Sequence, residues 1–179
     1  MAQDPSPIAL LMKEHEVILL AGQFITRLDG TWSEDEELYG KKVERLIEFF
    51  RVYSDMFHHE KEERILFRQL KEHPDFRLHE LIDELEEHHE NFRLQVASIE
   101  AAISEKKWVF AQKLLVEYIE ALADHIAVEN DELFVMTEML FSEMELSRMY
   151  FLFEDLDRAI GEDVKLELEH YLVEASGLG

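Results

Sequence analysis

The sequence has no cysteine, little glycine or proline, and few basic residues. The absence of cysteine excludes disulfide bonds, thiolate zinc sites and cysteine-ligated iron–sulfur clusters, so any metal site in this chain must use His and carboxylate ligands. Six Gly and three Pro in 179 residues are too few for a β-rich or disordered chain. Only 18 Lys and Arg stand against 41 Asp and Glu, and the resulting net charge of -23 repels nucleic acid and anionic lipid. We therefore expect no nucleic-acid or membrane partner.

The apolar content is sufficient for one helical domain, because 47% of the residues are hydrophobic. We expect a single domain over residues 1–179, with a core bundle at about 6–140 and a helical extension at about 142–175. Residues 1–7 contain no basic segment before an apolar stretch, and charged residues at 13–16 interrupt the apolar run at 8–25. This pattern predicts neither a signal peptide nor a membrane span, and it favours a cytoplasmic location.

Apolar residues recur at helical spacing in four long segments. The first segment is expected to start at Ser6 with Pro7 and to end at Gly30, and the second to start at the capping box of Ser33 and Glu36 and to stop at Pro74. The third is expected to start at an Asp75 cap and to end in the polar connection 104–107, and the fourth to start at Trp108. Short connections favour antiparallel neighbours, so the sequence predicts an all-α, up-down-up-down four-helix bundle. Part of 34–41 is expected to be irregular or to overhang the bundle.

Two further helices are expected after the bundle. Ser142 and Glu145 form another capping box, and Gly161 precedes a short helix at about 162–174. We expect these helices to cover an end or a side of the bundle, or to form the contact of a homodimer.

One motif occurs twice, 67 residues apart. His58, Glu62, Leu66 and Phe67 recur at identical spacing as His125, Glu129, Leu133 and Phe134. A His and a Glu four residues apart share one face of a helix, so each copy can direct an imidazole and a carboxylate at one metal ion. The repeat therefore predicts two metal ions.

Each helix of the expected bundle also offers a His at a similar depth. His58 and His89 both lie about 21 Å from their shared turn, at roughly 1.5 Å per residue, and His15 and His125 lie near the same level. The predicted metal ligands are His15, His58, Glu62, His89, His125 and Glu129. With both Glu residues bridging, two His on each ion and an oxo or hydroxo bridge, each ion has about five ligands, which leaves one open position on octahedral iron. Zinc and manganese also accept such ligands.

Alternatives exist in two of the helices and elsewhere. His59 with Glu63 competes with His58 and Glu62, but only the latter pair matches the repeat, so His59 and Glu63 are expected around the site or on the surface. His89 continues the apolar stripe of its helix, whereas His88 lies one position off it.

A ferritin-like plan would use Glu86 with His89 and Glu167 with His170. It would leave the repeated His–Glu pairs unexplained. We expect His73, His79 and His170 to be solvated.

Four segments together resemble the hemerythrin-like HHE cation-binding family over about residues 8–140. They are Lys13-Glu14-His15, His58-His59-Glu60-Lys61-Glu62-Glu63 ending in Leu66-Phe67, Glu87-His88-His89-Glu90, and Asp124-His125-Ile126 through Glu129 to Leu133-Phe134. The resemblance implies a four-helix bundle around a non-haem di-iron site that binds dioxygen, nitric oxide or related species. It implies ligands at His15, His58, Glu62, His125 and Glu129, with one His of the third helix.

The third helix departs from that pattern. Oxygen-carrying hemerythrins supply two His four residues apart there, but Leu85 precedes His89 and Glu84 precedes His88 at that spacing. One imidazole fewer favours reaction, sensing or iron handling over plain oxygen carriage.

The sequence therefore predicts a di-iron protein that binds or senses dioxygen or nitric oxide, or that handles iron. The alternative is a di-iron oxidoreductase or an iron–sulfur cluster repair factor acting on peroxide or nitric oxide, and a metal-free helical interaction module is a third interpretation. Apart from the metal ligands, no residue is a persuasive acid, base or nucleophile, so we assign no catalytic residue and leave enzyme activity open.

Overall fold

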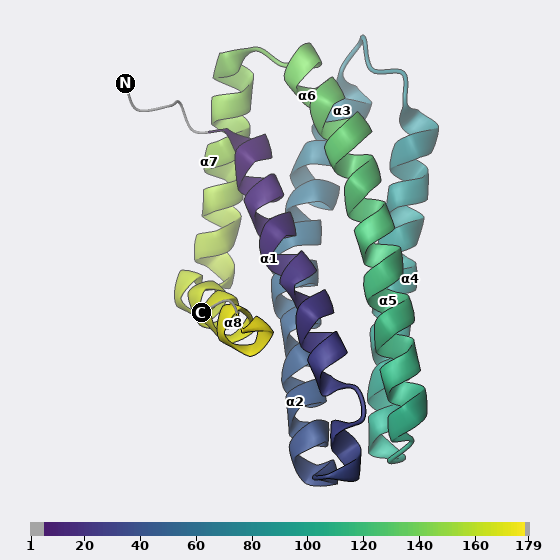
Figure 1. Cartoon of the computed structure of the whole chain (residues 1–179). Helices are drawn as coiled ribbons and strands as arrows, with labels where there is room; N and C mark the ends of the chain where they lie inside the picture. Colours follow the sequence, from purple (N-terminus) through teal and green to yellow (C-terminus); the bar gives the residue numbers. More distant parts are fainter. Residues whose placement is uncertain (1–5, 178–179) are drawn as a thin grey trace.

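The computed structural model describes residues 6–177, and this part of the chain consists of helices and short connections without a strand (Figure 1). It confirms the predicted all-α bundle with C-terminal helices. The elements are α1 (Pro7–Leu28), η1 (Thr31–Ser33), α2 (Glu36–Phe49), η2 (Phe50–His59), η3 (Glu62–Leu66), α3 (Phe67–Glu72), α4 (His79–Ser104), α5 (Trp108–Val128), η4 (Glu129–Leu133), α6 (Phe134–Leu140), α7 (Glu143–Ile160) and α8 (Glu162–Ser176).

The first helix starts as its sequence predicts. The Ser6 hydroxyl accepts a hydrogen bond from the Ala9 amide at 3.2 Å, and Pro7 occupies a position where no amide donor is needed. After α1 the chain turns through Gly30, whose φ of 78° lies in the left-handed region that glycine adopts without strain.

The second helix is capped two residues later than predicted. Asp35, not Ser33, accepts the hydrogen bond from the Leu38 amide at 2.9 Å. Ser33 instead lies in the 3₁₀ turn η1, where its hydroxyl donates to the Gly30 carbonyl, so the predicted Ser33–Glu36 capping box is wrong. Because α2 is regular from Glu36 onward, its first turns overhang α1 rather than being irregular (Figure 1).

From Glu36 to Glu72 the chain forms one continuous helical rod, along which the hydrogen-bonding pattern alternates between α-helical and π-helical. Segments η2 and η3 are π-helical, which means that their backbone hydrogen bonds span five residues and the helix is wider there. In the fourth rod of the bundle, η4 is a π-helical stretch between α5 and α6. All three stretches lie at the depth of the repeated His–Glu motif, where π turns often accompany functional sites.

The third helix begins later than predicted. Asp75 does not cap it, because α4 starts at His79 after Leu78, which makes no side-chain cap. Phe76 in the connection is only 1% exposed. The connection is non-helical as far as Leu78, and Phe76 is buried within this stretch.

The C-terminal helices pack along one side of the bundle. The capping box of Ser142 and Glu145 is present at the start of α7, as predicted. Helix α8 lies against α1, and both α7 and α8 contact η2 (Figure 1). They thus cover a side of the bundle. No helix in residues 6–177 combines the length and the apolar character needed to span a membrane.

Two hydrophobic clusters enclose a polar layer. One contains core residues from the α2 end of the bundle, such as Phe24, Val43 and Leu115. The other lies towards α3 and α6 and includes Leu66, Phe67 and Phe134, which belong to the Leu-Phe endings of the repeated motif. Burial of each such side chain contributes about 1.5–3 kcal/mol. These two clusters therefore offset the cost of burying polar groups between them.

Candidate metal centre

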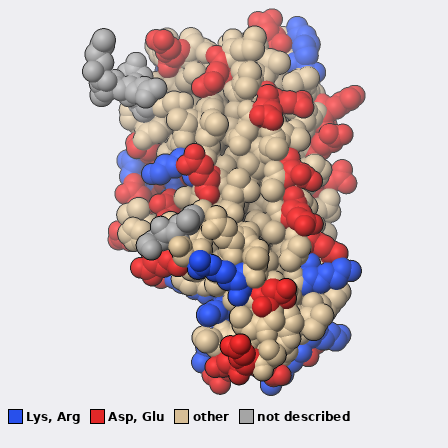
Figure 2. Space-filling model, viewed as in Figure 1, with Lys and Arg blue, Asp and Glu red and all other residues tan. Residues whose placement is uncertain are grey.

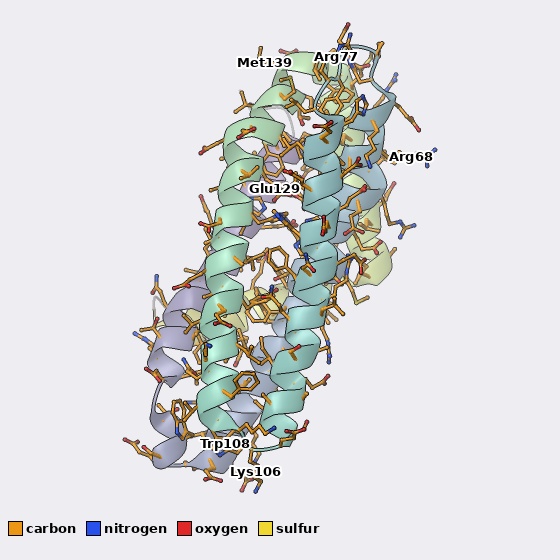
Figure 3. The ribbon with its side chains drawn as sticks, turned by 90° about the vertical axis from the view of Figure 1, so that its right-hand side faces the viewer. Arg68, Arg77, Lys106, Trp108, Glu129 and Met139 are labelled. Atoms are coloured by element: carbon orange, nitrogen blue, oxygen red, sulfur yellow. The ribbon has the colours of Figure 1, made fainter. Side chains whose placement is uncertain are left out.

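Seven buried side chains meet in the polar layer between the two hydrophobic clusters. They comprise the six predicted residues and one more, His59: His15, His58, His59, Glu62, His89, His125 and Glu129. None is more than 2% exposed. Glu129 lies inside the bundle, towards the end that carries Arg77 (Figure 3). The sequence-predicted residues therefore converge on one internal site.

Their potential ligand atoms fall into two groups that share Glu62. His15, His58, Glu62 and Glu129 form the first group, and His59, Glu62, His89 and His125 form the second; within each group the atoms lie within 4.8 Å of one another. We call these groups position 1 and position 2.

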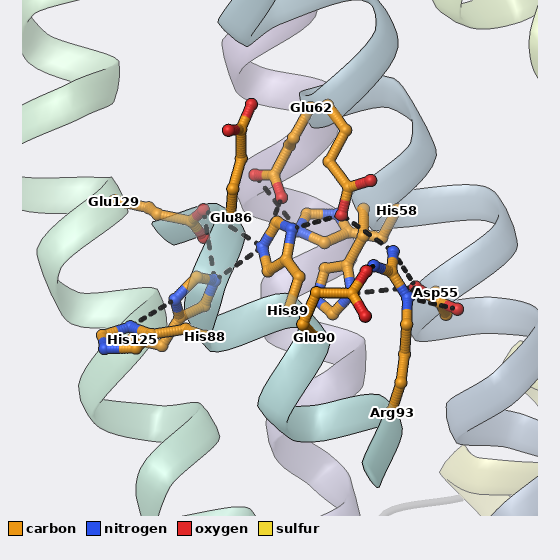
Figure 4. Close-up of polar contacts among 12 residues, drawn as sticks. Asp55, His58, Glu62, Glu86, His88, His89, Glu90, Arg93, His125 and Glu129 are labelled. Carbon is orange, nitrogen blue, oxygen red and sulfur yellow. Dashed lines mark hydrogen bonds and ion pairs between the residues drawn. The ribbon is translucent and has the colours of Figure 1, made fainter. Parts of the chain in front are cut away.

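Each carboxylate spans the two positions. Glu62 places Oε1 3.4 Å from Nε2 of His58 and Oε2 3.6 Å from Nε2 of His89. Glu129 places Oε2 3.3 Å from Nε2 of His15 and Oε1 3.2 Å from Nε2 of His125. The two carboxylates approach the histidines from different helices (Figure 4). This is the arrangement expected of two bridging carboxylates.

Several of these atoms are buried without a hydrogen-bond partner. They are Nε2 of His15 and His58 and all four carboxylate oxygens of Glu62 and Glu129. Most buried polar atoms in proteins are paired, because leaving one unpaired costs about 1–3 kcal/mol and more when it is charged. Carboxylate oxygens and unprotonated imidazole nitrogens that face one another need a cation between them. The donor set therefore fits metal ions.

The other ring nitrogen of each histidine is occupied by an outer partner. The Nδ1 contacts are His15 with Asn130 at 2.9 Å, His58 with Glu14 at 2.9 Å, His59 with Asp55 at 3.3 Å, His89 with Glu63 at 2.8 Å, and His125 with Nδ1 of His88 at 3.3 Å. A metal-ligating His typically donates its second N–H to such a partner, which fixes its tautomer and ring orientation. All five imidazoles thus present Nε2 to the cluster.

Two of the outer carboxylates are themselves held by one cation. Arg93 contacts Asp55 at 2.7 Å (Figure 4) and also contacts Glu63 at 2.8 Å. Although burial acts to raise it, the pKa of Asp55 is lowered by hydrogen bonds from His59 and Arg93. Arg93 therefore neutralises the carboxylates that orient His59 and His89.

The electrostatics of the cluster favour a cation. Burial lowers the pKa of His58 to about 3 and also lowers the pKa values of His59 and His89, so these imidazoles are neutral at pH 7. Burial, together with the adjacent Glu129 carboxylate, raises the pKa of Glu62. Although burial acts to raise it, the pKa of Glu129 is lowered by His125 and His15. A metal ion between two adjacent buried carboxylates would supply positive charge to both.

His59 is the residue whose position was predicted wrongly. It was expected around the site or on the surface, because successive residues of an α-helix point about 100° apart and only His58 matched the repeat. The π-helical winding of η2 instead lets both neighbours face inward. His59 stacks on His89, with ring centroids 3.8 Å apart. It thus brings a third imidazole to position 2, where the third helix lacks its second His.

The remaining histidines lie outside the cluster. His88 is exposed and reaches the site only through its contact with His125. His79 and His170 are exposed as predicted, whereas His73 is half-buried and packs edge-on against Phe141. The ferritin-like plan is wrong, because Glu167 is 67% exposed and pairs with Arg45 at the surface.

On the face drawn in Figure 2, acidic side chains are spread along the molecule and there is no continuous basic patch. This agrees with the net charge of -23.

Comparison with known proteins gives one family. The model of the hemerythrin HHE cation binding domain matches residues 6–137, a range that contains all seven clustered side chains and ends before α7. No curated protein and no solved structure gives a significant match to the chain.

Proposed function

Because the chain belongs to the hemerythrin HHE cation-binding domain family, we propose that its buried cluster holds two iron ions and that the protein reversibly binds or senses a small diatomic ligand, dioxygen or nitric oxide. The observation that carries this proposal is the pair of carboxylates, each of which touches an imidazole of position 1 and an imidazole of position 2. Iron bound there would supply one-electron redox chemistry and a coordination position for a small ligand.

The proposed donors divide unequally between the two positions. His15 and His58 would hold an ion at position 1, and His59, His89 and His125 would hold one at position 2. Glu62 and Glu129 contact imidazoles of both positions and would be shared between the ions. Position 1 therefore offers one imidazole fewer than position 2, and a small ligand would bind to an ion held there. Five imidazoles face the two positions, so the lack of a second His at the expected spacing in the third helix does not disfavour reversible binding.

The surroundings of position 1 favour binding over chemical conversion. The His15 ring stacks on Phe134, with centroids 5.4 Å apart, at the border of the hydrophobic cluster that includes Leu11 and Phe67. Among the described residues the fully or nearly buried acids are Glu14, Glu62, Glu129 and Asp157, and each is a proposed bridge or is paired with His or Lys. Each of these four buried acids is therefore committed to a proposed bridge or an ion pair, and none of them is free to deliver a proton to a bound ligand. The site thus suits an uncharged diatomic molecule that leaves unchanged.

A cavity of about 330 Å³ reaches His59 of position 2. Its lining combines the apolar Phe50, Met56, Phe92, Val96 and Tyr118 with the charged Arg51, Asp55 and Arg93.

The test is the electronic spectrum of the full-length protein purified from iron-replete cells. We expect about two iron ions per chain, near-ultraviolet bands of a bridged di-iron centre, and reversible spectral changes on adding and removing dioxygen or nitric oxide. Iron well below one per chain would overturn the proposal. Net consumption of peroxide or nitric oxide would instead support the di-iron oxidoreductase alternative.

A further inference from the structure

The two C-terminal helices contribute charged side chains to a second buried polar cluster next to position 1. Glu14 of α1, Lys61 between η2 and η3, Asp157 of α7 and Lys165 of α8 form this cluster, which we call the buried quartet. None of the four is more than 9% exposed. Asp157 and Lys165 lie beyond residue 137, where the family match ends.

The quartet is paired throughout. Lys61 donates to Glu14 at 2.8 Å and to the Phe57 carbonyl at 2.8 Å, and it forms an ion pair with Asp157. Lys165 donates to Asp157 at 2.6 Å and also to Glu14. Two carboxylates and two ammonium groups cancel in charge. Removing a single member would leave a buried charge without its partner.

Glu14 connects the quartet to the candidate metal centre. Its Oε1 accepts from both lysines, and its Oε2 faces Nδ1 of His58 at 2.9 Å. A carboxylate on Nδ1 makes an imidazole a stronger electron donor through Nε2, and cations on that carboxylate weaken this effect. The charge on Lys61 and Lys165 is therefore transmitted to the ring that serves position 1.

No other histidine of the centre has a comparable environment. His15 faces the neutral amide of Asn130, and His59 and His89 face carboxylates that share Arg93, which is 29% exposed. Water screens that pair of contacts, whereas the quartet is shielded from solvent. A change of one charge in the quartet should therefore act strongly on position 1.

We propose that Asp157 and Lys165 are positioning residues for the metal centre: the C-terminal helices hold Glu14 on His58 and set the charge that this imidazole experiences. The inference rests on the proposed di-iron site. It assigns to α7 and α8 a role in tuning the centre in addition to covering the bundle.

The experiment compares midpoint potentials of the iron-loaded full chain in four variants. Lys165→Met removes a positive charge and should favour the oxidised centre about tenfold, a shift of about 59 mV to lower potential for a one-electron step. Asp157→Asn removes a negative charge and should shift the potential in the opposite direction. The double variant restores the charge balance and should lie near the wild type. Glu167→Gln, which breaks the exposed contact of α8 with Arg45, should leave the potential unchanged.

The critical result is that the midpoint potentials of the two single variants shift in opposite directions, because a purely structural role would shift both potentials in the same direction. If Lys165→Met does not fold, the Asp157→Asn shift decides alone. Potentials that are unchanged, or shifts of the same sign, would overturn the inference.

A second measurement does not depend on iron. In ¹⁵N spectra of the metal-free protein, the Nδ1 proton of His58 should move downfield in Lys165→Met, because Glu14 becomes a stronger acceptor. An unchanged resonance would contradict the coupling. If this shift occurs but the protein binds no iron, the proposed function fails while the connection between the quartet and His58 stands.

Discussion

His59 stacks on His89 with their ring planes only 11° apart, although the two residues come from different helices. The contact places an imidazole of η2 beside the one His that α4 contributes to the cluster. A lone His on the third helix therefore does not mean a site with one imidazole fewer. The second helix provides two neighbouring histidines instead of one.

The first prediction concerns His59. Replacing it in His59→Leu should weaken binding of one of the two ions by more than about 100-fold, since even the loss of an outer partner of a ligand costs 10–100-fold. Metal titration by calorimetry or by elemental analysis after dialysis measures this. His79→Leu, at the exposed start of α4, is the control and should bind metal normally. Two tightly bound ions in His59→Leu would remove His59 from the ligand set.

The second prediction concerns the outer partner of His89. Glu63→Gln removes the carboxylate that contacts Nδ1 at 2.8 Å, so metal affinity at position 2 should fall about 10–100-fold while the fold is kept. Glu60→Gln, which loses only a surface contact with Arg64, provides the comparison. Equal affinities of the two variants would show that Glu63 does not orient His89.

The third prediction concerns the cost of assembling the bridging carboxylates. In Glu62→Gln the new amide can donate to Glu129, so the metal-free protein should gain about 1 kcal/mol or more in free energy of unfolding. The same variant should lose most of the stabilisation that metal gives, which is about 2.7 kcal/mol at a free metal concentration 100 times Kd. Urea denaturation with and without metal measures both effects. A metal-free variant less stable than the wild type would contradict this explanation.

The fourth prediction concerns pH. Folding lowers the pKa of His58 from 6.5 to about 3, so this group contributes stability above about pH 6.5 that is lost as the pH falls towards 3. Glu62 acts in the opposite sense, because its raised pKa favours the folded state at low pH. The effect of His58 is therefore read from the difference between wild type and His58→Leu, both metal-free. The loss of stability between pH 6.5 and 4 should be smaller in the variant, and parallel curves would argue against a neutral, buried His58.

The sequence was sufficient to predict the helices. It also predicted the six residues that the repeated His–Glu motif or the similar depth of the histidines brings together, because helical periodicity and four-residue spacing are local properties. It did not predict that His59 points inward, since π-helical winding changes the direction of neighbouring side chains without a clear sequence signal. The cap at Ser33 was wrong because Asp35, two residues later, accepts the capping hydrogen bond. The cap at Asp75 was wrong because the chain is non-helical as far as Leu78. The partners of Glu14 were not predictable either, because Lys165 lies 151 residues away in the chain.

The most direct test of the central claim is an anomalous difference map from crystals of the iron-loaded protein, recorded at the iron absorption edge. We predict two peaks bridged by Glu62 and Glu129, one beside His15 and His58 and the other beside His59, His89 and His125. A single peak, no peak, or a His59 ring turned away from the metal would contradict the account.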